Sequence, residues 1–229
     1  MLKRILLFTY SVIHVVGSAM ATEFDIIPGS KPPDENRAQA TMSRPGFYGK
    51  PLLGVIASQL DGDQASGYNK FGYQVGVVTG IRWKNDGFGA MEMQMSMNER
   101  GSRRAFDPIT FVNAFHIRCR QVELQVNGVY NATLPMLGSV SFLTGLRYAK
   151  LLKVEEMEGT NPGISEDFAK GNVMIELGIT KEVSHAMDVR FTWDYSLSSA
   201  VRQDRRNVLY PTGVYHNGVG VSALFKING

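Results

Sequence analysis

The chain has 229 residues, of which 44% are hydrophobic and 20% charged, enough for one substantial domain. Beyond the N-terminal segment no apolar run reaches about 18 residues, which argues against a helical membrane protein. Removing Lys3 and Arg4 with a leader peptide from the 24 basic and 21 acidic residues leaves a net charge of +1. A charge so near zero argues against nucleic acid as a partner.

Residues 1–21 have the three parts of a secretory signal peptide. Lys3 and Arg4 are basic, residues 5–16 are apolar, and Ala19-Met20-Ala21 is an A-x-A cleavage site. A first transmembrane helix is the alternative, but the apolar run is too short for it. We therefore expect export, with cleavage after Ala21.

Residues 22–49 carry prolines and glycines around a charged patch at 31–37, a composition that neither forms a regular strand nor buries much surface. We predict a Pro-rich periplasmic extension. A segment that folds back as a plug is the alternative.

Residues 50–229 then repeat one unit, a long segment in which apolar and polar side chains alternate. The first half contains the predicted strands 52–59, 72–83, 88–99 and 117–129. In the third of these, Met91, Met93, Met95 and Met97 alternate with Glu92, Gln94, Ser96 and Asn98. Successive side chains of a strand point to opposite faces, so one face is apolar and the other polar. We read the methionines as plain apolar surface because no histidine lies among them to suggest a copper site.

The second half contains the predicted strands 139–151, 171–183, 187–199 and 216–227, and the clearest alternation lies in 171–183 and 187–199. These segments exceed the roughly 5–6 residues of an ordinary strand. Strands of about 9–11 residues with this alternation suit a tilted bilayer crossing.

The connections between the eight predicted strands are alternately long and short. An even-stranded membrane barrel places all its short turns at one rim and all its long loops at the other. The sequence thus predicts an all-β fold, an eight-stranded antiparallel transmembrane β-barrel at 50–229.

The polar face carries nine charged side chains that the pattern directs into the barrel. They are Arg82, Glu92, Glu123, Arg147, Glu176, Asp188, Arg190, Asp194 and Lys226. Isolated buried charges are costly, so we expect a paired, hydrogen-bonded interior without an open pore. An ion path or proton relay is the functional alternative.

The long connections carry a second basic set, predicted to be exposed on surface loops. It comprises Arg100, Arg103, Arg104, Arg202, Arg205 and Arg206. Asp107 with His116, or Asp204 with His216, could be drawn as acid–base pairs, but their spacing matches no catalytic motif. We predict no enzyme activity, catalytic residue, cofactor or metal.

Several stretches resemble PorT-family outer-membrane β-barrel proteins. They are L-L-G-V-I-A-S-Q-L-D-G-D (52–63), F-G-Y-Q-V-G-V (71–77), E-M-Q-M-S-M-N-E-R-G-S-R-R (92–104), R-Q-V-E-L-Q-V (120–126), G-L-R-Y-A-K-L-L (145–152) and G-V-G-V-S-A-L-F (218–225). The family includes a component of the type IX protein secretion and gliding apparatus and many barrels of unknown role.

A barrel too narrow to conduct must act through its rims, its lipid face or its extension. We therefore predict an envelope anchor or accessory subunit in the outer membrane of a Gram-negative cell, with membrane lipid and envelope proteins as partners. The resemblance implies a type IX-like system of protein secretion or surface assembly. One alternative is a free-standing structural or adhesive barrel. Another is a soluble lipocalin-like carrier, whose apolar residues would face inward.

Overall fold

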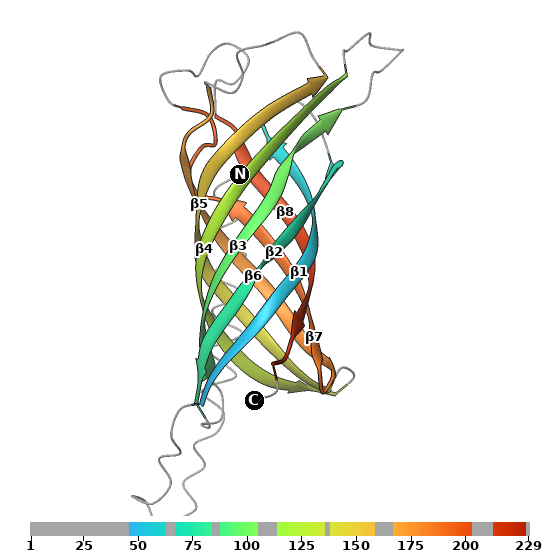
Figure 1. Ribbon diagram of the computed structural model, residues 1–229, viewed down its shortest axis with the longest axis vertical. Helices are drawn as coiled ribbons and strands as arrows, with labels where there is room; N and C mark the ends of the chain where they lie inside the picture. Colours follow the sequence, from blue (N-terminus) through green and yellow to red (C-terminus); the bar gives the residue numbers. More distant parts are fainter. Residues whose placement is uncertain are drawn as a thin grey trace, which may run out of the picture. The chain divides into compact units, whose positions relative to one another are not determined.

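The computed structural model describes residues 46–62, 67–83, 88–104, 114–135, 138–158, 167–202 and 213–227. They form a closed barrel in which each strand pairs antiparallel with its neighbours in the chain and β1 pairs with β8 (Figure 1). The strands are β1 (Gly46–Asp61), β2 (Lys70–Arg82), β3 (Phe88–Arg104), β4 (Phe115–Leu134), β5 (Gly138–Glu158), β6 (Gly171–Ser184), β7 (Met187–Ser196) and β8 (Tyr215–Phe225). The predicted fold class is confirmed.

The two faces of the barrel are chemically distinct, as the alternation predicts. On β3, Met95 is 58% exposed, whereas the next inward residue, Gln94, is 2% exposed. Exposed apolar and buried polar side chains alternate in the same way on β7, where Phe191 is exposed and Arg190 and Thr192 are buried. We call the exposed apolar side chains on the outside of the strands, among them Val77, Met95, Leu124 and Phe191, the outer belt. The lipocalin-like alternative is excluded, since it requires the apolar residues inside.

The connections sort to two ends, as predicted. Residues 83–87, 135–137 and 185–186 join strands at one end, here called the short-turn end. Residues 62–69, 105–114, 159–170 and 197–214 join them at the other, here called the long-loop end. Among the described residues, no helix is long and apolar enough to cross a membrane.

Several strands are longer than the sequence predicts, mainly toward the long-loop end. β3 continues from Glu99 to Arg104, and β5 continues to Glu158. The alternation of apolar and polar residues weakens there, but the backbone ladder between β4 and β5 continues through two irregularities in register. In contrast, β7 ends at Ser196, three residues before its predicted end.

The end of the N-terminal extension also differs from the predicted one. β1 begins at Gly46, so residues 46–49, which we assigned to the extension, belong to the barrel. The predicted signal peptide and residues 22–45 lie outside the described residues.

An apolar cluster lies at the long-loop end. Leu60 of β1 and Ile117 of β4 are buried there with Phe168 and Val201, which pair as an isolated bridge between two connections. Buried Cys119 belongs to the same cluster. The long connections therefore contribute apolar side chains to the interior at this end.

Candidate functional site

Five charged side chains in the middle of the barrel form what we call the central network, namely Arg100, Glu123, Arg147, Glu176 and Asp194. Arg100 Nη1 and Nη2 donate to Oδ1 and Oδ2 of Asp194 at 2.6 and 3.0 Å, and its Nε donates to Glu123 at 3.1 Å. Arg147 pairs with Glu123 at 2.9 Å and with Glu176. All five are at most 1% exposed.

The central network crosses the lumen. Arg100 lies on β3 and Asp194 on β7, which are four strands apart in the closed ring of eight and so stand opposite each other. Gly218 of β8 makes room for this pair, because a Cβ there would lie 2.5 Å from Arg100 Nη1. An eight-stranded barrel has an interior that side chains can fill. These side chains span it from wall to wall.

Toward the short-turn end, a second pair crosses the lumen between the same two strands. Arg190 Nη2 of β7 pairs with Glu92 Oε2 of β3 at 2.6 Å. Arg190 also donates to Gln94 at 3.3 Å and to Thr180 at 2.9 Å. Tyr48 of β1 donates to the other oxygen of Glu92 at 2.7 Å. Two carboxylate–guanidinium bridges thus join opposite walls.

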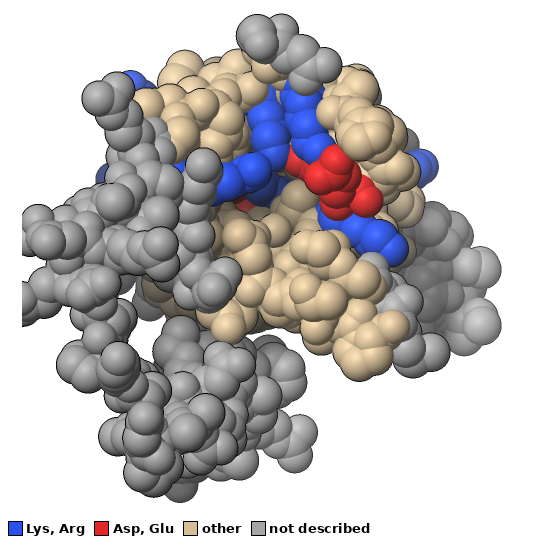
Figure 2. Space-filling view, turned by 90° about the horizontal axis from the view of Figure 1, so that it is seen from below, with Lys and Arg blue, Asp and Glu red and all other residues tan. Residues whose placement is uncertain are grey.

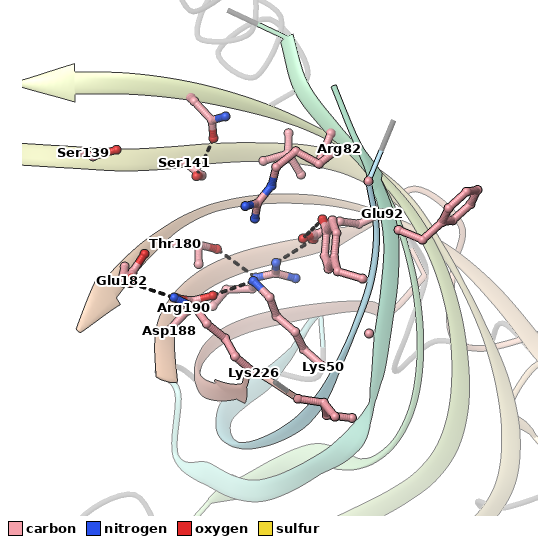
Figure 3. A pocket seen from close by; sticks show the side chains of 18 residues that line it. Lys50, Arg82, Glu92, Ser139, Ser141, Thr180, Glu182, Asp188, Arg190 and Lys226 are labelled. Carbon is pink, nitrogen blue, oxygen red and sulfur yellow. Dashed lines mark hydrogen bonds and ion pairs between the residues drawn. The ribbon is translucent and has the colours of Figure 1, made fainter. Parts of the chain in front are cut away.

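Between this second pair and the short-turn rim lies a cavity of about 500 Å³, which we call the short-turn cavity (Figure 3). Its charged lining is contributed by Lys50, Arg82, Glu92, Glu182, Asp188, Arg190 and Lys226. Seen from below, basic and acidic side chains gather where the barrel is hollowed (Figure 2). The accessible interior is therefore strongly polar at this end.

The acidic groups at the rim of this cavity are held by lysines. Lys50 binds Asp188 at 2.6 Å, and Lys226 reaches both Asp188 at 3.1 Å and Glu182 at 2.8 Å. Lys226 lies just beyond the end of β8. Desolvation lowers its pKa, but the hydrogen bonds and attraction of Glu182 and Asp188 outweigh this and raise the pKa above its ordinary value. Lys226 is therefore charged at neutral pH.

Arg82 is bound differently from the other cations of the cavity. Its guanidinium lies 5.2 Å from the centre of the Tyr48 ring, and Lys50 Nζ lies 5.0 Å from the same ring. Arg82 is exposed and has no acidic partner within the part of the chain that the structure describes. A cation over an aromatic face gains modest stabilisation while its hydrogen-bond donors stay available.

A separate ionic cluster lies near the long-loop end. Glu99 forms ion pairs with Lys70 at 2.6 Å, with Arg118 at 3.2 Å and with Arg120 at 3.7 Å. Arg118 and Arg120 also approach Glu155, at 3.8 and 3.6 Å. Cations and carboxylates are interleaved here, so this cluster neutralises much of its own charge.

The structure brings most of the predicted interior set together in the lumen. Glu92, Glu123, Arg147, Glu176, Asp188, Arg190 and Asp194 are all buried. Arg82 and Lys226 lie instead at the short-turn rim, where Arg82 is exposed and Lys226 has a side chain 22% exposed. The strands end at these positions, so water reaches them.

The predicted loop set is wrong at Arg100. Because β3 runs on to Arg104, Arg100 keeps the inward direction of Glu92 and Asn98 and is fully buried. Arg103 is exposed on the same strand, and Arg202 is exposed in a connection. The side chain of Arg104 and residues Arg205 and Arg206 lie outside the described residues.

Sequence reasoning missed the charged residues Lys50 and Glu182 of the short-turn cavity, and it also missed Tyr48. Tyr48 falls in the stretch 22–49 that we assigned to the extension, and Lys50 lies between that stretch and the predicted strand 52–59. The alternation of β1 carried a signal, since Lys50 shares its inward direction with Leu52 and Ile56. The two conceivable acid–base pairs, at His116 and at His216, each need an aspartate that lies outside the described residues.

No protein-family model matches the chain, and no curated protein matches it significantly. Among solved structures, Ail, the attachment invasion locus protein of Yersinia pestis, is similar at 13% identity and a TM-score of 0.41, over 80% of this chain and 99% of that one. Neisserial surface protein A is similar at 11% identity and a TM-score of 0.37, over 79% of this chain and 97% of that one. The outer membrane protein OprG from Pseudomonas aeruginosa is similar at 10% identity and a TM-score of 0.34, over 80% of this chain and 94% of that one. Likenesses this distant say nothing of what this chain binds.

The chain's own geometry defines its class. A closed antiparallel barrel with an apolar outer belt and a charged interior is a β-barrel of the outer-membrane type. Within that class it is a narrow, eight-stranded barrel whose lumen is crossed by ion pairs.

Proposed function

We propose that this protein is a non-enzymatic, non-conducting barrel of the outer membrane that serves as an envelope anchor or accessory subunit. The observation that carries the proposal is the pair of bridges across the lumen, Arg100 to Asp194 and Arg190 to Glu92. A barrel that is filled by paired charges cannot act by conduction, so it acts through its rims or its lipid face.

The outer belt supports insertion in a membrane. Large apolar side chains on neighbouring strands are exposed, including Val77 on β2, Met95 on β3 and Leu124 on β4. Their cross-strand pairing, Val77 with Met95 and Met95 with Leu124, makes the surface continuous. Water-soluble monomers rarely expose contiguous apolar surface beyond a few hundred Å². Lipid is the solvent that suits this surface.

Two measurements on the wild-type protein test this part. Membranes are washed with carbonate, and the protein is run on gels before and after boiling; we expect it in the outer-membrane fraction with a heat-dependent shift. The purified protein is also added to a planar bilayer beside a porin, and we expect no current steps. Recovery in the soluble periplasm, or reproducible current through the pure barrel, contradicts the proposal.

The finer proposal is a role in a type IX-like system of protein secretion or surface assembly. Its support is the resemblance to PorT-family barrels at residues 52–63, 71–77, 92–104, 120–126, 145–152 and 218–225. The test is a clean deletion followed by comparison of the proteins released into the medium. Loss of many cargo proteins outside, with their accumulation in the periplasm, is the expected result.

An unchanged set of released proteins rejects the secretion role and favours the free-standing structural or adhesive barrel. The exposed Arg103, near the long-loop end of β3, is the observation that supports that second candidate. Arg100 cannot contribute to it because its side chain is fully buried.

A further inference from the structure

The short-turn cavity has one more positive than negative side chain in its described lining. Each of its three carboxylates is bonded to a cation, Glu92 to Arg190, Glu182 to Lys226 and Asp188 to both lysines. Arg82 is left over at the exposed rim, beside Tyr48. A guanidinium offers a planar fork of donors that matches a carboxylate. The cavity therefore presents an available anion-binding group.

A strand edge lies beside this group. β1 pairs with β2 from Gly46 onward, but it pairs with β8 only from Leu52 to Asp61. No described strand pairs with residues 46–51 on that side. Alternate residues of an antiparallel strand direct N–H and C=O groups to each side, so this edge offers backbone groups for pairing, although Pro51 cannot donate. Residues 46–50 also line the cavity.

From these two observations we infer that the short-turn cavity binds an extended acidic peptide segment of an envelope protein. The segment pairs with residues 46–51 of β1 and sets a carboxylate against Arg82. Strand addition of this kind takes its affinity from the backbone and its specificity from side-chain pockets. The cavity volume of about 500 Å³ is that of a typical ligand pocket. A simple anion such as phosphate satisfies Arg82 but leaves the strand edge unused.

The inference deepens the proposed function, because it rests on a barrel in the outer membrane. Barrels of that membrane have their short turns on the periplasmic side, which exposes the short-turn cavity to proteins of the periplasm. Its test uses the whole purified protein in detergent and a fluorescent peptide in which aspartate alternates with valine. We expect saturable binding that weakens as salt rises. Arg82→Gln should reduce the affinity by roughly tenfold or more, because a charge-assisted hydrogen bond is lost. The matched control Arg103→Gln, which removes an exposed arginine at the other end of the barrel, should leave binding unchanged.

Two altered probes separate the strand edge from the charge. The same peptide with alternate amides N-methylated keeps its carboxylates but cannot pair as a strand, and we expect its binding to be lost. The peptide with asparagine for aspartate should bind at least about tenfold more weakly. Equal binding of either altered probe, displacement of the acidic peptide by an equal concentration of inorganic phosphate, or no effect of Arg82→Gln overturns the inference.

These outcomes are independent of those that test the membrane proposal. A barrel that carries no current but fails to bind the acidic peptide refutes only the peptide site. A barrel that binds the peptide and also conducts refutes only the non-conducting role.

Discussion

Removing Arg100 should destabilise the barrel more than any exposed charge does. Arg100 makes two bonds to Asp194 and one to Glu123, with all three side chains at most 2% exposed. In Arg100→Leu the ion-pair partner that the described residues leave to these carboxylates is Arg147, whose Nη1 is 2.9 Å from Glu123 and 3.5 Å from Asp194. Breaking a buried pair by removing one partner costs about 3–5 kcal/mol. We expect a loss of that size in the free energy of unfolding.

The assay is urea unfolding of the protein in lipid vesicles, followed by the fluorescence of the tryptophans, of which Trp193 lies on the outer face. Arg103→Leu, an exposed arginine on the same strand, is the control and should change the free energy by less than about 0.5 kcal/mol.

A double-mutant cycle makes the test specific. In Arg100→Leu/Asp194→Leu, the bidentate pair is removed together, so the loss should be smaller than the sum of the two single losses by about 1–3 kcal/mol. Additive losses, or an Arg100→Leu protein as stable as Arg103→Leu, would refute the reasoning that the cross-lumen pair is an energetically coupled unit.

Three further changes have expected outcomes in the same unfolding assay. Gly218→Ala places a Cβ 2.5 Å from Arg100 Nη1 and should cost about 1–3 kcal/mol, a cost that shrinks in the Arg100→Leu background. Met95 lies near the middle of β3, so Met95→Lys puts a charge in the outer belt and should cost about 2–4 kcal/mol, whereas Met95→Leu should be nearly neutral. Phe168→Ala opens a space in the apolar cluster at the long-loop end and should cost about 3–5 kcal/mol; a loss below about 1 kcal/mol would contradict its packing role.

Where the alternation is regular, as in β3, the sequence contained enough to predict which face the strand turns to the lumen. The alternation of Met91, Met93 and Met95 with Glu92 and Gln94 follows from the two-residue period of a strand, and burial confirms it. The same period extended by one step would have placed Arg100 inside. The prediction stopped at Glu99 because Arg-Gly-Ser-Arg-Arg is also a typical loop composition.

The partners inside the lumen could not be predicted in this way. Alternation assigns a side chain to a face but does not say which residue stands across the ring from it. That Arg100 meets Asp194, and Arg190 meets Glu92, depends on the register of every strand pair between β3 and β7. The two-residue period excludes a shift of one residue between strands but not a shift of two, so alternation alone does not specify that register.

The bridge from Arg100 to Asp194 also constrains how the barrel assembles. Its two residues are 94 positions apart and stand on opposite walls, so they meet only when the sheet curls. In a flat or half-curled sheet both charges, and those of Arg190 and Glu92, would need water. Entry into lipid before the seam between β1 and β8 closes would strip that water away at high cost. Closure must therefore precede or accompany insertion, and the ion pairs form only in a barrel whose strands are in the correct register.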